Sequence, residues 1–195
     1  MTYDNIIFDI GGVLLDWNPE AILNKFYSKE ISKKLSALTL TKRWAEYDRG
    51  LEDRNDLYNY FISLEPDYPD EVRFLVFEIF KNMDVFYDTV EIAKELKSKD
   101  KKLFLLSNFT EIGFDYVYEK YDFFQLFDGK VISCYVNLIK PEREIYEHIH
   151  RKFSLDLEKT IFIDDNDDNV SGATDYGIKT IKFTSPEKLR KDLGL

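Results

Sequence analysis

Asp9 is the first side chain whose setting suggests chemistry. It follows the short apolar run 5–8 and precedes the glycine pair Gly11-Gly12. A carboxylate at the end of a buried strand is placed to act as a nucleophile, and residues without a Cβ let backbone groups approach a metal ion and a phosphate closely. An isolated Asp-Xaa-Gly is more often a turn or a helix cap. Asp9 therefore needs partners elsewhere in the sequence before it predicts a catalytic site.

Two further segments carry groups suited to a phosphate. Ser107, with Asn108 after it, follows the apolar run 103–106, and its hydroxyl together with the amides of a helix N-terminus would hold a phosphate oxygen. A serine that only caps the helix is the simpler interpretation, and the two roles are compatible. Lys140 precedes Pro141, which in an arbitrary sequence indicates a solvated lysine beside a helix-starting proline. A lysine held in a fixed position can instead neutralise the repulsion between an attacking carboxylate and a phosphate dianion.

The fourth segment is acidic and runs from Asp164 to Asn169, directly after the apolar run 160–163. It is not a calcium-binding loop, because no register places glycine at the sixth position and glutamate at the twelfth. The adjacent aspartates Asp164 and Asp165 would be partly desolvated at the end of an apolar strand, and would repel each other unless a cation compensates. Hard oxygen ligands at an open site favour Mg²⁺ over a softer metal, whereas a solvated acidic turn would need no ion.

The elements that must position these groups alternate between strands and helices. Short apolar runs predict strands at 6–8, 103–106, 131–135, 160–163 and 180–183. Apolar residues on one face predict helices at 89–98 and 142–152, and Ser185-Pro186 predicts a further helix start. This alternation predicts an α/β fold with a parallel sheet covered on both faces.

Residues 16–85 interrupt the alternation with amphipathic helical patterns and little strand signal. Helices are predicted there at 19–27, 42–48, 54–62 and 70–80. The segment leaves the sheet just after Asp9 and returns before Leu103, so it can lie over the carboxyl ends of the strands, where open parallel sheets bind ligands. We therefore expect residues 1–15 and 86–195 to form an α/β core and residues 16–85 to form a helical cap.

Composition limits the classes of partner. The chain has 195 residues and a formal net charge of -10, which disfavours nucleic acid and anionic membranes as partners, since both require a basic face. The single Cys134 cannot form an internal disulfide, Asp4 stands where a signal peptide would need a basic start, and no apolar run approaches ~18 residues. The acidic charge suits a metal dication better, and these features predict a soluble, cytoplasmic protein whose oligomeric state stays open.

The ordered set of motifs resembles the haloacid dehalogenase-like hydrolase superfamily over almost the whole chain. The matching motifs are Asp9-Ile10-Gly11-Gly12-Val13, Ser107-Asn108, Lys140-Pro141 and Asp164-Asp165. The resemblance implies a Rossmann-like core with an inserted helical cap. It also implies a phosphatase in which Asp9 forms an aspartyl-phosphate, a covalent route open to carboxylates.

The resemblance also implies roles for individual residues. Mg²⁺ would be held by the Asp9 carboxylate, the Gly11 backbone carbonyl and Asp165, with Asp164 as a second ligand or an orienting group. Phosphate would be bound by Ser107, Asn108 and Lys140, and Lys140 would also support catalysis by neutralising charge. Positioning and charge neutralisation would supply most of the rate.

A narrower similarity connects the chain to the bacterial alpha-D-glucose-1-phosphate phosphatase branch and, more distantly, to the phosphatase domain of soluble epoxide hydrolase. It is carried by the segment 8–13, by Asp48-Arg49-Gly50 and by the segment 162–169. That branch tends to carry glycine at the position of Gly11, where most of the superfamily has a second aspartate. The branch implies a sugar-phosphate substrate. Arg49 is expected either to contact substrate from the cap or to pair on the surface with Asp48 or Glu52.

Gly11 keeps alternatives open. In most of the superfamily the residue at this position protonates the leaving alcohol, a role that typically contributes ~10²-fold to ~10⁴-fold. We expect slow turnover of poor leaving groups unless another acid comes from the cap or the substrate. A 2-haloacid dehalogenase also uses the aspartate nucleophile and lacks this second aspartate, but needs no metal, so Asp164-Asp165 favours a phosphatase. A phosphate-binding or interaction protein that has lost turnover is the third possibility.

Overall fold

Five parallel strands form one sheet with the order β3-β2-β1-β4-β5 in the structure, a computed structural model that describes residues 3–195. The strands are β1 (Asn5–Phe8), β2 (Lys102–Ser107), β3 (Gly129–Ile132), β4 (Thr160–Asp164) and β5 (Lys179–Lys182). Phe8 at the end of the central strand pairs with Leu105 on one side and Ile163 on the other. The residues that follow these three strands therefore leave the sheet side by side at its carboxyl edge.

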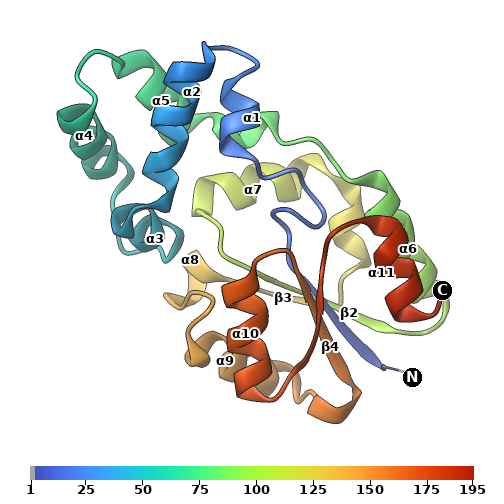
Figure 1. Ribbon diagram of the computed structural model, residues 1–195. Coiled ribbons are helices and arrows are strands. Elements are labelled where there is room, and N and C mark those ends of the chain that lie inside the picture. Colours follow the sequence, from blue (N-terminus) through green and yellow to red (C-terminus); the bar gives the residue numbers. More distant parts are fainter. Residues whose placement is uncertain (1–2) are drawn as a thin grey trace.

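Helices cover both faces of the sheet, as Figure 1 shows. The core helices are α6 (Tyr87–Ser98), α7 (Glu111–Lys120), α8 (Ser133–Val136), α9 (Arg143–Phe153), α10 (Asp167–Tyr176) and α11 (Pro186–Leu193), with 3-10 turns η3 (Asp122–Leu126) and η4 (Leu157–Lys159). Successive strand residues point to opposite faces. Ile6 and Phe8 accordingly pack in one apolar cluster with α6, α7 and α11, and Ile7 packs in a second cluster with α9 and α10. Both faces are buried, and the expected α/β fold with a Rossmann-like parallel sheet is confirmed.

A run of short helices separates β1 from α6. It comprises α1 (Pro19–Leu23), α2 (Lys29–Ser36), η1 (Ala37–Leu40), α3 (Lys42–Asp48), α4 (Arg54–Leu64), α5 (Pro69–Phe77) and η2 (Ile79–Asn82). Side-chain caps define several of these starts: Asn18 accepts from the Ala21 amide beside Pro19, and Asp53 accepts from the amides at the start of α4. Figure 1 shows this group beyond the end of β1, at the edge of the sheet where the strands finish.

Several predicted boundaries shift. The strand predicted at 131–135 ends at Ile132, because its ladder partner β2 ends at Ser107, and residues 133–136 form α8 instead. The helix predicted at 19–27 stops at Leu23, where the chain turns and brings Phe26 and Tyr27 against Phe74.

The remaining differences lie at helix ends. The helix predicted at 70–80 starts at Pro69, ends at Phe77 and is followed by η2. Helix α2 has no counterpart among the predicted helices. Within residues 3–195, no helix has both the length and the apolar character that crossing a bilayer requires.

Candidate active site

The carboxyl edge of the sheet brings four of the predicted side chains into contact. Asp9 follows β1, Ser107 ends β2, and Asp164 ends β4. Lys140 comes from the loop between α8 and α9, and its Nζ lies 2.8 Å from Asp9 Oδ1 and 2.6 Å from Asp164 Oδ2. All four are buried, and Lys140 is only 2% exposed. A lysine is almost never buried unless it is paired, so the interpretation of Lys140 as a solvated residue is wrong.

Asn108 holds Lys140 in this position. Its Oδ1 accepts a hydrogen bond from the Lys140 amide at 2.8 Å, and its Nδ2 donates to the Lys140 carbonyl at 2.9 Å. The Lys140 ammonium also lies 5.3 Å from the centre of the Phe162 ring, an additional favourable contact. The side chain of Asn108 therefore fixes the backbone of Lys140, and its predicted contact with phosphate stays a prediction.

The buried charges at the site shift the pKa values of Asp9 and Lys140. Burial raises the pKa of Asp9, and the charge of Asp164 adds to that effect, while Lys140 and a hydrogen bond from Ser107 oppose it. Burial alone would lower the pKa of Lys140, but the charges of Asp164 and Asp9 outweigh it and raise that pKa. Lys140 is therefore held protonated between two carboxylates.

A third carboxylate, Asp165, adjoins this pair. One oxygen from each of Asp9, Asp164 and Asp165 lies within 4.8 Å of the other two, so three acidic groups meet here while Lys140 pairs with only Asp9 and Asp164. Burial, followed by the charge of Asp164, raises the pKa of Asp165. A divalent cation would relieve this repulsion, and a cluster of hard carboxylate oxygens is the donor set that Mg²⁺ prefers. The residues present therefore fit the expected ion.

The two adjacent aspartates differ in how their oxygens are used. Asp164 Oδ2 accepts from Lys140, and its Oδ1 accepts from the Asn166 amide at 2.8 Å and from Asn169 Nδ2 at 3.1 Å. Asp165 is exposed and lies against Gly12, where an added Cβ would stand 2.2 Å from Asp165 Oδ2. Gly12 also has a positive φ of 72°, which favours glycine. Asp164 is thus occupied by protein groups, whereas the Asp165 side chain is accessible from solvent.

Gly11 lies where Trp17 leaves little room for a side chain. A Cβ at Gly11 would stand 3.1 Å from the Cβ of Trp17, which is tighter than an ordinary contact. The Trp17 ring stacks on Trp44 of α3, with ring centres 6.1 Å apart. The position that carries a second carboxylate in most of the superfamily is therefore bordered here by an aromatic pair.

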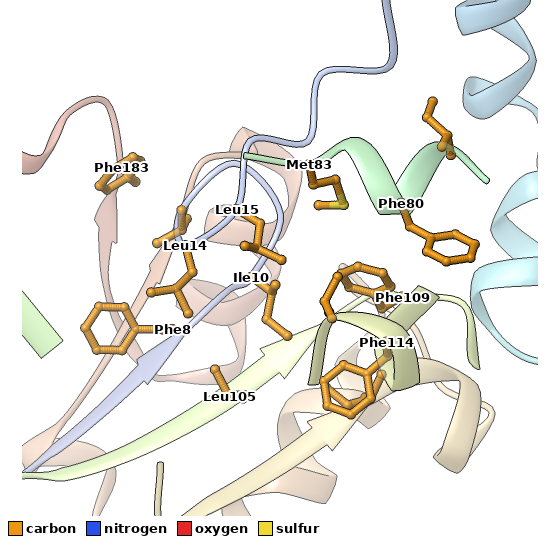
Figure 2. Packing of buried hydrophobic residues seen from close by; sticks show 14 of the residues in the cluster. Phe8, Ile10, Leu14, Leu15, Phe80, Met83, Leu105, Phe109, Phe114 and Phe183 are labelled. Atoms are coloured by element: carbon orange, nitrogen blue, oxygen red, sulfur yellow. The ribbon is translucent and has the colours of Figure 1, made fainter. Parts of the chain in front are cut away.

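A cavity of about 260 Å³ opens above Asp9. Its floor includes Asp9, Lys140 and Asp165, and Gly11 also borders it. Its upper wall is largely apolar and includes Trp17, Trp44, Leu75, Ile79, Phe80 and Met83. Figure 2 shows Phe80 and Met83 near Phe109, which lines the cavity from the core. The cavity thus combines a charged floor with an aromatic and aliphatic wall.

Arg49 does not line this cavity among the described residues. Its guanidinium makes two hydrogen bonds with Glu142, at 2.7 and 2.6 Å, and lies 3.4 Å from Glu46. The expected surface partners are wrong, because Glu52 pairs with Arg43 instead. Contact between Arg49 and substrate stays a prediction, and it would require the pair with Glu142 to open.

Asp48 also lines the cavity, although the sequence motifs predict no role for it. It is the last residue of α3, and burial raises its pKa to about 7, although a hydrogen bond from Trp44 opposes the shift. The signal available in the sequence was Asp48-Arg49-Gly50 itself. Gly50 has a φ of 80°, and an added Cβ would lie 2.5 Å from the Cys134 carbonyl oxygen. The conformation of this turn thus requires glycine after Arg49.

Two known proteins are similar to this chain in sequence. The sesquiterpene phosphatase astK of Aspergillus oryzae is 26% identical over 184 residues, which cover 94% of this chain and 91% of that protein. The drimenol cyclase drtB of Aspergillus calidoustus is 26% identical over 195 residues, which cover 96% of this chain and 35% of that protein. This chain therefore corresponds to about a third of the cyclase and to nearly all of the phosphatase.

Solved structures share the fold. The HAD family enzyme bt-2542 of Bacteroides thetaiotaomicron, in complex with magnesium and inorganic phosphate, is similar with a TM-score of 0.71 and 20% identity, covering 93% of this chain and 94% of that one. A dehalogenase with an intermediate complex has a TM-score of 0.80 and 15% identity, and the match covers 100% of this chain and 98% of that one. The pattern of the haloacid dehalogenase-like hydrolases matches residues 3–177. This chain therefore belongs to the haloacid dehalogenase-like hydrolase family.

Proposed function

We propose that this hydrolase is a Mg²⁺-dependent phosphatase that cleaves small phosphomonoesters through an aspartyl-phosphate on Asp9. The observation that carries the proposal is the buried Lys140 between Asp9 and Asp164, with Asp165 beside them. A dianionic phosphate needs such positive charge before a carboxylate can approach it. The sesquiterpene phosphatase relative and the magnesium and phosphate complex of a protein of the same fold also support it.

In this proposal Asp9 attacks phosphorus, and the bond from phosphorus to the alcohol oxygen breaks. Water then attacks the aspartyl-phosphate, releasing inorganic phosphate and regenerating Asp9. The Ser107 hydroxyl and the Lys140 ammonium bind the phosphate oxygens, and Asn108 keeps Lys140 in place.

Mg²⁺ would be held by Asp9, Asp165 and the Gly11 carbonyl. Asp164 acts as the orienting group, because its oxygens already accept from Lys140, Asn166 and Asn169. When bound, the ion supplies positive charge that screens the phosphate from the attacking carboxylate.

We also propose that residues 16–85 act as the cap and that residues 1–15 and 86–195 act as the catalytic core. The cap residues that border the cavity, including Trp17, Leu75 and Ile79, then select the alcohol part of the substrate. The floor is formed by core residues only, so the cap would recognise the substrate and the core would carry out the reaction.

Two substrate classes follow from different observations. The resemblance to the alpha-D-glucose-1-phosphate phosphatase branch supports a sugar phosphate. The apolar side chains of the upper wall, including Trp17, Trp44 and Phe80, support a phosphate ester of an apolar alcohol, because they would bury its hydrocarbon part. The sesquiterpene phosphatase relative agrees with the second class.

The test is phosphate release with and without Mg²⁺ from glucose 1-phosphate, farnesyl monophosphate and p-nitrophenyl phosphate. The Asp9→Asn variant is the matched control, because it keeps the shape and removes the nucleophile. We expect release to stop with a chelator, to return with Mg²⁺, and to be absent in Asp9→Asn. Halide release from a 2-haloacid that survives the chelator would assign the dehalogenase activity instead. Phosphate binding without turnover on every substrate would assign the non-catalytic function.

A further inference from the structure

The proposed phosphatase reaction leaves one proton without a donor. When the bond from phosphorus to the alcohol breaks, the leaving oxygen must be protonated unless it is already a weak base. Gly11 has no side chain, and Trp17 borders the space beside it. Because displacement at phosphorus is in line, the leaving oxygen points away from Asp9, into the cavity that residues of the inserted helices also line. The donor must therefore come from that wall or from the substrate.

Five titratable side chains line the cavity among residues 3–195, and four are unsuited to this role. Asp9 is the proposed nucleophile, Lys140 is held protonated by two carboxylates, and Asp165 belongs to the acidic cluster on the floor. Burial raises the pKa of Tyr47 to about 12, too high for an effective proton donor near neutral pH. Only Asp48 remains.

The backbone of Asp48 is fixed to the core. The Ser133 hydroxyl donates to the Asp48 carbonyl at 2.5 Å and accepts from the Phe109 amide at 2.9 Å. Ser133 is completely buried, and Phe109 lies two residues after Ser107. One hydroxyl thus connects Asp48 to the loop that follows β2.

The residues after Asp48 are fixed in the same way. Asn137 Nδ2 donates to the Arg49 carbonyl at 3.0 Å, and the Arg49 guanidinium binds Glu142, two residues beyond Lys140. Gly50 lies against the backbone of Cys134. The turn 48–50 is therefore held on residues 133–142, the stretch that also carries Lys140. The position of Asp48 is thus set relative to the floor of the cavity.

The surroundings of the Asp48 carboxyl favour its protonated form. Burial raises the pKa of the Asp48 carboxyl to about 7. Trp44, one turn earlier on α3, donates a hydrogen bond to it that opposes this rise only in part, and the Trp44 ring stacks on Trp17. Two titratable groups lie close enough for the charge of Asp48 to affect their pKa values, Tyr47 on α3 and Cys134 on α8. Burial raises the pKa of each, so both are neutral at neutral pH. The adjacent Arg49 is turned to Glu142. A carboxyl group with a pKa near 7 is protonated in about half of the molecules at neutral pH and can then donate a proton.

From this geometry we propose that Asp48 is the general acid and base of the reaction, a catalytic residue that takes the place left empty at Gly11. This inference rests on the proposed phosphatase function. As the bond to the alcohol breaks, protonated Asp48 gives its proton to the leaving oxygen and becomes a carboxylate. It then takes a proton from the water that attacks the aspartyl-phosphate. The balance is one water consumed, one alcohol and one phosphate released, and Asp48 protonated again.

The experiment compares Asp48→Asn with the wild type on leaving groups of different basicity. An alkyl phosphate requires protonation of its leaving oxygen, whereas p-nitrophenyl phosphate does not. We expect Asp48→Asn to lower kcat/KM, which reports formation of the aspartyl-phosphate, ~10²-fold to ~10⁴-fold for the alkyl substrate and less than about tenfold for p-nitrophenyl phosphate. Loss of the base should lower kcat for both substrates, because both form the same aspartyl-phosphate. The matched control is Asp67→Asn, which removes an exposed aspartate of the inserted segment and should change neither rate.

Each other outcome is decisive. An equal loss of kcat/KM on both substrates would assign Asp48 a structural role, and an unchanged kcat/KM on the alkyl substrate would assign the proton to another source. Either result overturns the inference while the proposed function stands. If the wild type releases no phosphate, or if Asp9→Asn is as active as the wild type, the proposed function fails and this inference with it. If Asp48→Asn does not fold, the wild type alone decides, because an internal acid predicts a rate nearly independent of leaving-group basicity and its absence predicts a steep decline.

Discussion

The Asp48→Asn substitution should stabilise the protein, and by an amount that depends on pH. Burial raises the pKa of Asp48 to about 7 from an ordinary value of 3.8. Between these values the folded protein binds a proton that the unfolded chain does not, so the stability of the wild type falls as pH rises from about 4 to about 7. Asparagine has no charged form and escapes this loss. The stability difference should be near zero at pH 4 and reach its maximum above pH 7.

The size of the effect follows from the shift. A shift of about 3 units at ~1.4 kcal/mol per unit gives an upper limit of about 4 kcal/mol. Asp48 is partly exposed, so solvent screening reduces the expected value to roughly 2–4 kcal/mol above pH 7. The hydrogen bond from Trp44 can be kept by the asparagine side-chain oxygen, so its loss should not offset the gain.

The assay is urea unfolding of both proteins at several pH values from 4 to 8.5. The other raised carboxyls, Asp9 and Asp165, are present in both proteins and cancel in the difference. A stability difference that is constant with pH, or that shrinks above pH 7, would refute the idea that the Asp48 carboxylate is destabilised by burial. Stabilisation together with loss of alkyl phosphatase activity would show that the acid is kept at the expense of stability.

Three further substitutions test other parts of the site. Lys140→Met should destabilise the protein by about 3–5 kcal/mol at neutral pH, because it leaves the buried carboxylates of Asp9 and Asp164 without their cation. Urea unfolding measures the stability, and a decrease below about 1 kcal/mol would contradict this expectation. Gly12→Ala should weaken Mg²⁺ binding at least about tenfold in a calorimetric titration, since the new Cβ would displace the Asp165 carboxylate. An unchanged affinity would show that Asp165 is not a ligand of the ion. Arg49→Met should lower the stability by about 1 kcal/mol or less, because Glu142 is partly exposed. If the pair of Arg49 with Glu142 is structural, KM should stay within about twofold of the wild type. A large rise in KM at unchanged stability would instead support contact between Arg49 and the substrate.

The location of the site could be predicted because its signals are local. Asp9, Ser107 and Asp164 each follow an apolar run, and parallel strands bring such positions to one edge of a sheet. The boundaries of the third strand and of the first helix could not be predicted in this way. β3 ends where β2 stops providing a partner, and α1 ends where the chain turns toward Phe74. Both depend on residues distant in the sequence.

The roles of individual polar groups needed the folded structure for the same reason. Asn108 reads in the sequence as a phosphate contact beside Ser107, yet its side chain is engaged by the backbone of Lys140. Arg49 has acidic neighbours in sequence, but its main partner, Glu142, is 93 positions away. Hydrogen-bonding capacity is a property of the residue type, whereas the choice of partner follows from what packing leaves within reach.

The sequence by itself thus determined the parallel α/β core, the order of the motifs and the absence of a carboxylate at Gly11, because periodicity and residue identity are properties of short segments. Only the tertiary structure decided which side chains lie around Gly11, where that carboxylate is missing. It placed Trp17 beside Gly11 and held Asp48 over the same cavity through contacts with Ser133 and Trp44. Burial by segments distant in the chain, and not the identity of the aspartate, raises the pKa of Asp48 toward neutrality.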